Sequence, residues 1–596
     1  MKNVLSLKKR VFSVCVLLAF LFPFAAACGK SPVAAEKTTV RIAATDYQRE
    51  YLRATEEAFN AQSEDYRLEF VVCPSREVRN YYLSHGALNA DIVLFDNLYA
   101  VNVNSDYLLD IRRFEGTVEY RASILDYMRK DDGSLYALPA PGELFCNAYN
   151  ADLLGENNVA LPRTLNDVIL LSQRLNRQSV TGSVISSATG GDDSVFNALL
   201  SVVYPSFLFS PRGHVFIKDY LLGKTSMGDE AYRKDWQAVF DYFSSLYSNR
   251  FYSLDSTEKT DRQEISRFLS GSTYAMQIAP SVDAKEVLSG STVLAPYLGI
   301  NELSRCVGST PRYFVSLTAE VADSEKKLAG AKSFLSFLSS DEGQRLNGVN
   351  GEADGKISYL KGQKSYGKDL DGIRDCLDQG RIFVCDYFYV MFEKNVDLLK
   401  KFLTDALSVD QLIDSLDEAM EKSFVSPKYY EAEKDFDFDP EKVVREETAI
   451  GNFFVDCVRR AAETEVCLLP SSAILGNILK GPFTEVQLCG LLADGNYTFV
   501  SVRAGGLADR IRRSTELLLL SGASTDASGR LCRNGVPFDD EKVVYALIPE
   551  DIAEDLSDWI VRKGSSRTLY SLVGEFGLGD TVSPPGKDGR YGFLPA

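Results

Sequence analysis

Strand-like and helix-like segments alternate along the first two thirds of this 596-residue chain. Residues 39–44 predict a first strand, an amphipathic helix is expected to end near Phe59, and residues 66–72 predict the next strand. Residues 90–95 form a nearly continuous apolar run, which is typical of a buried central strand. This β-α-β order predicts a parallel sheet covered by helices on both faces, with ligands expected just past the carboxyl ends of its strands.

Length and composition predict at least two domains. Hydrophobic residues make up 45% of the chain, enough to bury substantial cores. Residues 426–440 are acidic, aromatic and bounded by prolines, and they show neither a helical nor a strand period, which favours a linker. We therefore expect one domain over 38–425, a second over 441–582 and a loose tail over 583–596.

The first residues predict export from the cytoplasm. Basic residues at positions 2, 8, 9 and 10 precede an apolar run over 11–24, and Ala25-Ala26-Ala27 precede Cys28. Because a membrane span needs about 20 apolar residues, we interpret 1–27 as a cleaved signal peptide. The junction resembles a bacterial lipobox, which would leave Cys28 as a lipidated first residue on the outer face of the membrane. Ala25 stands where such motifs usually carry leucine, so an ordinary A-x-A cleavage site remains the alternative.

Net charge and cysteine content limit the classes of partner and of site that the chain can have. Removing 1–27 takes away four positive charges and moves the formal net charge from −18 to −22, which argues against nucleic acid and against a polybasic membrane patch. Nine cysteines remain besides Cys15 and Cys28, an odd number without a CxxC pair. We interpret them as small buried hydrophobes rather than disulfides or metal ligands.

Histidine is almost absent, which constrains catalysis. The chain has only His85 and His214, too few for a histidine-based dimetal centre or a confident Ser-His-Asp set. The glycines at 190 and 191 lack the lysine of a phosphate-binding loop and precede two aspartates. We therefore predict no catalytic residue, no metal and no cofactor, although the many carboxylates leave open a hydrolase with an unrecognised acidic site.

Five segments follow one another along the first two thirds of the chain: 132–139 (DGSLYALP), 145–154 (FCNAYNADLL), 161–168 (LPRTLNDV), 268–276 (FLSGSTYAM) and 329–344 (AGAKSFLSFLSSDEGQ). In this order they resemble the sugar branch, family 1, of the extracellular solute-binding proteins of ABC importers. The resemblance implies an α/β fold with two lobes that close on a hinge over a sugar or oligosaccharide. It also implies delivery of this solute to ABC permease subunits.

Neutral polyols are held by aromatic faces together with carboxylate and amide groups. Candidate ligand residues lie at loop positions of the first lobe, around the proline-rich turn and in the second lobe: Asp46, Tyr47, Asp96, Asn97, Glu143, Phe145, Trp236, Tyr274 and Arg312. Structural roles compete with these assignments. Asp46 could cap a helix, Asp96 and Asn97 could be turn or cap residues, and Trp236 has the helical period of a core aromatic.

The last third of the chain contains, in order, the segments 446–460 (EETAIGNFFVDCVRR), 465–469, 481–486 and 495–506. Together they resemble the C-terminal domain of bacterial 5′-nucleotidases, and this resemblance implies a separate α/β or α+β domain. Segments used there for nucleotide binding are replaced by 470–475, 493–494 and 549–555, and only Asn496 is retained. We interpret this domain as a structural or interaction module. An adaptor lipoprotein whose C-terminal domain captures a nucleoside or docks a partner is the alternative to solute import.

Overall fold

The first strand, β1 (Thr38–Thr45), lies inside a mixed five-stranded sheet of order β2-β1-β3-β10-β4. The computed structural model describes residues 37–591 except 179–185, 188, 222–223, 279–283, 289–290, 301–303, 350–355, 363–367, 385–391, 393–394, 424–428 and 580, so the predicted signal peptide and Cys28 lie outside the described residues. β2 (Tyr66–Cys73) and β3 (Ile92–Phe95) pair in parallel with β1, which confirms the three predicted strands. β10 (Phe314–Leu317) and β4 (Leu138–Pro139) continue the sheet in antiparallel pairings, so the prediction of a wholly parallel sheet is wrong.

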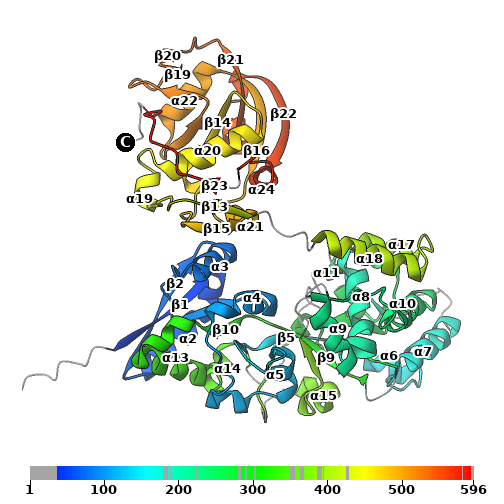
Figure 1. The fold of residues 1–596 in the computed structure, drawn as a ribbon. Coiled ribbons are helices and arrows are strands. Elements are labelled where there is room, and N and C mark those ends of the chain that lie inside the picture. The colour runs from blue at the N-terminus through cyan, green and yellow to red at the C-terminus, as the bar shows by residue number, and fades with distance from the viewer. Residues whose placement is uncertain are drawn as a thin grey trace, which may run out of the picture.

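Helices cover this sheet to form the first lobe (Figure 1). In α2 (Asp46–Gln62), Leu52, Thr55 and Phe59 are buried at helical spacing, and Phe59 packs edge-on against Phe334 and Phe337. The latter two belong to a helix that returns to this lobe late in the chain, visible in green beside the blue elements. The remaining helices of the lobe are α3 (Arg76–Ser84), α4 (Leu98–Val103), α5 (Ala122–Met128), α13 (Glu325–Leu338) and α14 (Asp341–Leu346).

The second lobe is built on another mixed sheet, of order β12-β9-β5-β7-β6. Its longest strand, β5 (Gly142–Asn150), begins three residues after β4 of the first sheet, and β9 (Val307–Pro311) ends three residues before β10 of the first sheet. The chain therefore crosses between the lobes at 139–142 and again at 311–314. The other strands are β6 (Ser186–Ser187), β7 (Ala275–Ile278), β8 (Thr292–Ala295), β11 (Lys356–Ile357) and β12 (Ile382–Val384).

Aromatic-rich helices fill the second lobe. They are α6 (Ala151–Glu156), α7 (Leu165–Gln178), α8 (Asp193–Val203), α9 (Pro211–Leu221), α10 (Arg233–Ser248), α11 (Asp261–Leu269), α12 (Ala284–Val287), α15 (Arg374–Asp378), α17 (Val396–Leu403) and α18 (Val409–Ser423). A π-helical turn over Tyr204–Leu208 links α8 to α9. Among the described residues no single helix is long and apolar enough to cross a membrane; only the pair Asp193–Leu208 and Pro211–Tyr220, bent by 111°, has the required length and composition together.

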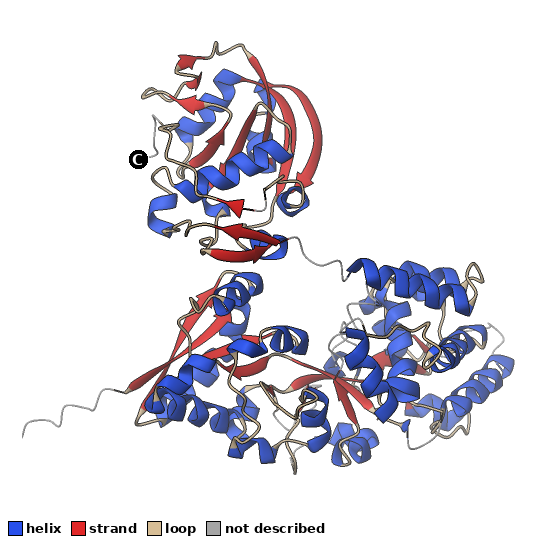
Figure 2. Ribbon diagram, viewed as in Figure 1, coloured by secondary structure: helices blue, strands red, loops and turns tan. Residues whose placement is uncertain are grey.

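The C-terminal part has its own five-stranded sheet, of order β17-β14-β21-β16-β22, with helices against it (Figure 2). The strands are β14 (Val466–Pro470), β16 (Asn496–Arg503), β17 (Leu518–Ser521), β21 (Val543–Pro549) and β22 (Ile560–Thr568), and the helices are α19 (Pro440–Val443), α20 (Ala449–Ala461), α21 (Glu485–Gly490), α22 (Ala504–Arg513), α23 (Glu550–Asp555) and α24 (Leu569–Val573). β22 is an edge strand of nine residues, largely exposed, with register shifts against β16. Leu547 and Leu469 face one apolar core and Val500 and Val544 face the other.

Two further small sheets complete the C-terminal part. One has the order β15-β13-β23, with β13 (Tyr429–Ala432), β15 (Gly481–Thr484) and β23 (Thr581–Val582), and the other joins β18 (Ser524–Thr525), β19 (Leu531–Arg533) and β20 (Val536–Pro537). β13 lies within the predicted linker 426–440, so residues 429–432 of that segment are a paired strand. The eight described cysteines are free, and the burial of seven of them confirms their interpretation as small hydrophobes; Cys385 is outside the described residues.

The end of the chain is attached to this part rather than loose. The Tyr591 hydroxyl accepts a hydrogen bond from the Leu520 amide at 2.8 Å, and Arg590 forms an ion pair with Asp456 at 2.9 Å. The Arg590 side chain is only 11% exposed. The prediction of a loose tail over 583–596 is therefore wrong up to residue 591. The segment after the prolines has little regular structure, but its side chains attach it to the C-terminal part.

Candidate functional site

Polar side chains gather where β1 and β3 end at the same edge of the first sheet. Thr45 caps α2: its hydroxyl accepts from the Gln48 amide, and the Gln48 side chain accepts from the Thr45 amide at 3.0 Å. This capping box buries Gln48, and the Gln48 side-chain amide donates to the Asp96 carboxylate, just after β3, at 2.7 Å. The two strand ends are thus tied together side chain to side chain.

Arg79 of α3 also contacts Gln48 and Asp96. Its side chain is fully buried, donates to Gln48 Oε1 at 3.2 Å and lies 3.5 Å from Asp96 Oδ2. The guanidinium also stands 5.1 Å from the centre of the Phe95 ring. Burial lowers the pKa of Arg79, and the neighbouring Asp96 carboxylate opposes that shift. We call Arg79, Gln48 and Asp96 the Asp96 network; it places a charged, partly exposed carboxylate at the sheet edge.

A second group, the hinge cluster, consists of Tyr47, Tyr51, Glu143 and Arg312. Glu143 is the second residue of β5, and Arg312 lies between β9 and β10, so each follows or precedes a crossing between the lobes. The Arg312 guanidinium donates twice to Glu143 Oε1, at 3.0 and 3.2 Å. It also lies over the Tyr51 ring at 4.4 Å. A planar cation is thereby held between a carboxylate and an aromatic face.

Tyr47 is the most exposed member of the hinge cluster. Its hydroxyl lies 2.8 Å from that of Tyr51, and the two rings meet edge to face. The hydrogen bond to Tyr51, followed by burial, raises the pKa of Tyr47 to about 12, so its phenol stays neutral at physiological pH. With 66% of its surface exposed, Tyr47 offers a free aromatic face beside a carboxylate and a guanidinium. Such a surface suits a neutral, hydroxyl-rich molecule.

The structure brings together four of the predicted ligand residues: Tyr47, Glu143 and Arg312 in the hinge cluster, and Asp96 in the neighbouring network. Asp46 is the exposed first residue of α2, beside them, and Thr45 rather than Asp46 is the cap. Asn97 has the structural role that competed with ligand binding. It caps α4, because its side-chain oxygen accepts from the Ala100 amide at 2.8 Å.

Three predicted ligand residues lie elsewhere. Phe145 and Trp236 are 2% and 0% exposed and belong to the core of the second lobe, so their assignment to the site is wrong. Trp236 packs edge-on against Phe207 and Phe216, as its helical spacing in α10 also allowed. Tyr274 pairs with Asn150 at the far end of β5, seven residues from Glu143, or about 23 Å along an extended strand. Its hydroxyl accepts from the Asn157 side chain instead.

Sequence reasoning missed Gln48, Tyr51 and Arg79. Thr45 and Gln48 form a T-x-x-Q capping box, a signal that was present at the sequence level. Tyr51 follows Tyr47 at helical spacing and could have been found as its neighbour. Arg79 carries no comparable signal, since an arginine on an amphipathic helix is ordinarily exposed. Only the packing of α3 against the sheet shows that its side chain is buried.

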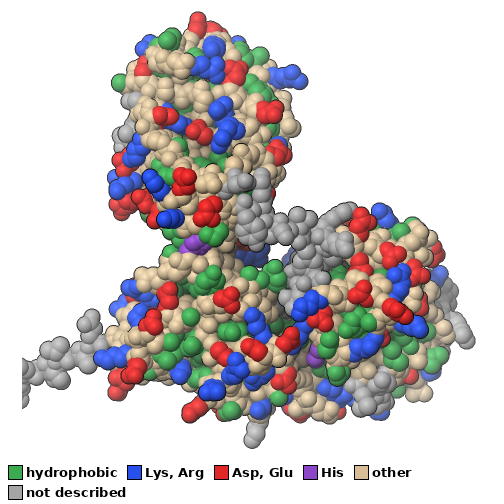
Figure 3. All heavy atoms as spheres, viewed as in Figure 1, with side chains coloured by type: hydrophobic (Ala, Val, Ile, Leu, Met, Phe, Trp, Pro, Cys, Tyr) green, Lys and Arg blue, Asp and Glu red, His purple; other side chains and the backbone are tan. Residues whose placement is uncertain are grey.

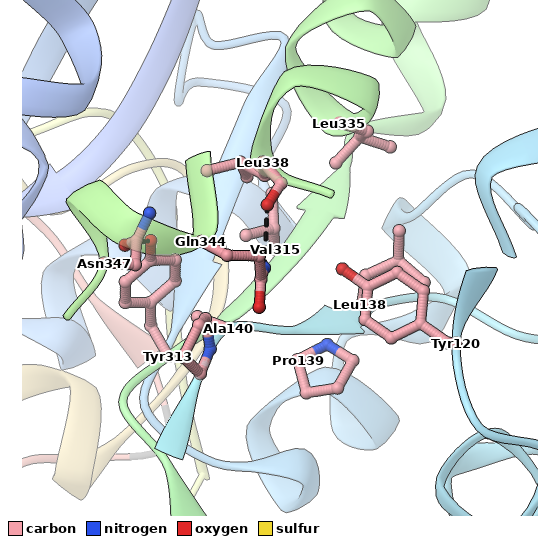
Figure 4. Close-up of a pocket in the computed structure, with 11 residues that line it drawn as sticks. Tyr120, Leu138, Pro139, Ala140, Tyr313, Val315, Leu335, Leu338, Gln344 and Asn347 are labelled. Atoms are coloured by element: carbon pink, nitrogen blue, oxygen red, sulfur yellow. Dashed lines mark hydrogen bonds between the residues drawn. The ribbon is translucent and has the colours of Figure 1, made fainter. Parts of the chain in front are cut away.

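A small cavity is lined by Tyr120, Tyr313 and residues 138–141 (Figure 4). Its volume is about 10 Å³, enough for one water molecule at most. The polar groups on its wall already have partners, since the Gln344 amide donates to the Leu338 carbonyl at 2.8 Å and the Tyr313 hydroxyl donates to Asn347. This cavity therefore cannot hold a solute, and the open surface around Tyr47 is the better candidate.

The C-terminal part has a larger opening, of about 400 Å³. Its wall includes Asp494, Glu550 and Asp551 at the ends of strands, together with Asn496 and the buried Tyr497. Three carboxylates without an arginine or lysine on the wall repel an anionic ligand. Within the described parts of the chain, no three His, Cys, Asp or Glu side chains lie together as a metal site requires.

Comparison with known proteins bears on the two-lobed part. Residues 54–348 match the family model of bacterial extracellular solute-binding proteins. No curated protein sequence matches the chain. Among solved structures, a family 1 extracellular solute-binding protein from Bifidobacterium longum subsp. infantis is 18% identical with a TM-score of 0.53, over 65% of this chain and 100% of that one.

Two further solved structures have a similar fold. A binding protein of Bacillus subtilis in an open conformation is 16% identical with a TM-score of 0.50, over 65% of this chain and 97% of that one. A bacterial solute receptor described as having an exclusive preference for β-D-galactopyranose is 11% identical with a TM-score of 0.51, over 66% and 99%. The two-lobed part of this chain thus matches the bacterial extracellular solute-binding proteins, in sequence over residues 54–348 and in fold over both lobes.

Proposed function

We propose that the protein captures a sugar or oligosaccharide outside the cytoplasm and delivers it to the permease of an ABC importer, without catalysing a reaction. The hinge cluster carries this proposal. An exposed tyrosine, a carboxylate and a guanidinium meet at two of the chain crossings between the lobes. A polyol offers hydroxyl donors to Glu143, acceptors to Arg312 and an apolar ring face to Tyr47.

The position of the cluster supports a hinge mechanism. A solute that contacts Tyr47 on the first lobe and a group on the second lobe binds the closed form more tightly than the open form. Because Glu143 and Arg312 sit on the crossings themselves, their ion pair is close to the backbone that must bend. One structural relative, 11% identical, is described as preferring a galactopyranose, which is consistent with a neutral sugar as the solute.

A thermal-shift screen of the full-length mature protein tests this function. A solute present at 100 times its dissociation constant stabilises the folded state by about 2.7 kcal/mol, a readable change in melting temperature. We expect mono- and oligosaccharides to include a stabilising ligand and nucleosides to give no shift. Glu143→Gln should weaken the shift, whereas Glu57→Gln, an exposed carboxylate on α2, should leave it unchanged. Stabilisation by nucleosides alone would refute solute import of this class.

We also propose that Cys28 is lipidated and holds the protein on the outer face of the membrane. The basic start, the apolar run over 11–24 and the cysteine at the junction support this. Metabolic labelling with a fatty-acid analogue should tag the wild-type protein and leave Cys28→Ala untagged. Equal labelling of both would contradict the anchor.

For the C-terminal part we propose a degenerate 5′-nucleotidase C-terminal domain over 441–582, joined by the segment 426–440 to the solute-binding domain over 38–425. The resemblance of 446–460 supports the assignment, and the acidic opening disfavours a phosphate-bearing ligand. The purified protein should release no phosphate from AMP with added divalent cations. Metal-dependent release that a carboxylate substitution abolishes would support the hydrolase alternative instead.

A further inference from the structure

Helix α3 of the first lobe is built into the core of the C-terminal part. Val78 and Tyr81 are fully buried, and they pack with Phe483 and Leu488, which belong to the C-terminal part. Figure 1 shows α3 directly below α21 and β15, and Figure 3 shows that the C-terminal part meets the rest of the molecule over a narrow waist. A nine-residue helix therefore provides much of the contact between the two parts.

Hydrogen bonds fix the position of α3 at this interface. The Tyr81 hydroxyl accepts from the Leu479 amide at 2.7 Å and donates to the Leu479 carbonyl at 3.2 Å. The Tyr82 hydroxyl accepts from the Asn477 amide at 3.1 Å. At the start of the helix, the hydroxyl of its cap Ser75 donates to the Gly490 carbonyl at 3.3 Å.

Two glycines allow this close approach. A Cβ added at Gly490 would lie 2.3 Å from the Cβ of Glu77, and one added at Gly476 would lie 2.3 Å from the Tyr82 hydroxyl. Both distances are far below van der Waals contact, so a side chain at position 490 must displace α3 or the C-terminal part, and one at position 476 must displace the Tyr82 side chain.

A neighbouring face of α3 holds the Asp96 network, because consecutive residues of a helix point about 100° apart. Arg79 follows Val78 directly, and its guanidinium reaches Gln48 at 3.2 Å and Asp96 at 3.5 Å. These distances are close to the limit for a hydrogen bond, so a small displacement of α3 breaks them. One rigid helix about 13 Å long thus connects the docking interface to the ends of β1 and β3.

We propose that docking of the C-terminal part on α3 sets the order of the Asp96 network, so that solute binding and docking are energetically coupled. The functional meaning of this coupling rests on the proposed solute site, whereas the coupling itself does not. Coupling of this kind is reciprocal: a solute that fixes Asp96 tightens the interface by the same factor as docking improves solute affinity. Arg79 acts as a positioning residue in this scheme, because it reaches the solute only through Asp96 and Gln48.

Hydrogen exchange of the full-length protein tests the coupling without any ligand. The Gly476→Ala/Gly490→Ala variant forces the interface apart, and exchange of the Leu479 amide, which is bonded to Tyr81, reports that opening. The amides of Gln48 and Ala100, bonded to Thr45 and Asn97, report order at the site. We expect exchange to rise roughly tenfold at all three amides.

Matched variants separate coupling from general loosening. Gly155→Ala changes another helical glycine, with nothing within 4 Å of the added carbon, and should leave all three amides at wild-type rates. Arg79→Lys weakens the Asp96 network without touching the interface, so by reciprocity it should raise exchange at Leu479 as well as at Gln48 and Ala100. If circular dichroism shows that the glycine variant is unfolded, Tyr81→Phe/Tyr82→Phe takes its place, because it opens the interface without a steric clash.

Faster exchange at Leu479 with unchanged exchange at Gln48 and Ala100 would overturn the proposal. So would a glycine variant that folds and keeps Leu479 fully protected, because the tight packing would then be wrong. Neither result depends on which solute binds, so both are distinct from failure of the solute-binding function itself.

Discussion

The two lobes differ in the exposure of the side chains that were predicted from the sequence to bind the ligand. In the first lobe and at its crossings, Asp96, Glu143 and Arg312 are partly exposed and lie among other polar groups. In the second lobe, Trp236 and Phe145 are buried in an aromatic core, and Tyr274 lies beside the far end of β5. Asp96, which follows a strand directly, is thus a surface side chain, whereas Trp236, an aromatic residue at helical spacing, lies in the core.

The physical reason lies in backbone geometry. A residue that follows a buried parallel strand emerges at the sheet edge, where its side chain meets those of neighbouring strands. An aromatic residue at helical spacing instead faces whatever the apolar stripe faces, and in α10 that stripe includes Trp236, Phe240 and Phe243, all buried. The contrast between an open polar edge and a packed aromatic core can be tested by substitution.

The largest effect is expected at Trp236. Trp236→Ala removes a fully buried indole from the second-lobe core and should destabilise that lobe by about 3–5 kcal/mol, measured by urea unfolding. Trp236→Phe, which keeps an aromatic ring, should cost clearly less. Near-wild-type stability together with lost solute binding would show that Trp236 belongs to the site after all.

Asp96 should come next. Asp96→Ala leaves the fully buried Arg79 without its carboxylate, so we expect destabilisation of about 2–3 kcal/mol in the absence of solute. Asp96→Asn, which keeps an acceptor for Gln48, should recover part of this loss. Unfolding curves of the two variants without ligand provide the measurement, and an unchanged midpoint for Asp96→Ala would show that Arg79 is solvated.

Glu143 should affect ligand binding rather than stability. Its ion pair with Arg312 is partly exposed, with side chains 38% and 18% exposed, so Glu143→Ala should cost no more than about 1 kcal/mol without solute. Solute affinity, measured by calorimetry with the sugar found in the screen, should fall about tenfold because a charged acceptor is lost. If stability falls more than affinity, the ion pair is structural.

The smallest effect is expected from His214 in the second lobe. Burial, and then Lys218, lowers the pKa of His214 below its ordinary value of 6.5, so the unfolded chain takes up a proton that the folded chain does not. Stability from this group is present above pH 6.5 and is lost as pH falls towards the folded-state pKa. His214→Phe should reduce the loss of melting temperature between pH 7.5 and 5.0 by about 1–2 °C. A larger loss of melting temperature in the variant than in the wild type would show that the pKa of His214 is not lowered by folding.

Much of the first lobe could be predicted from the sequence, because its strands and caps are local. The strands at 39–44, 66–72 and 90–95 lie within two residues of β1, β2 and β3. The sheet order could not be predicted, since β10 reaches β3 only after a long excursion through the second lobe. For the same reason Glu143 and Arg312 were found as separate candidates, and their ion pair follows only from the register of β5 with β9.

The exposed edge strand β22 bears on how copies of this protein behave when crowded. An unpaired edge of nine residues could add a strand from a second molecule. Here Arg562 and Lys563 stand on that edge beside Gly564, and the register shifts bend the strand away from a flat alignment. Like charges would face each other if two edges met, so the chain can expose this backbone to water at high density without growing into intermolecular sheets.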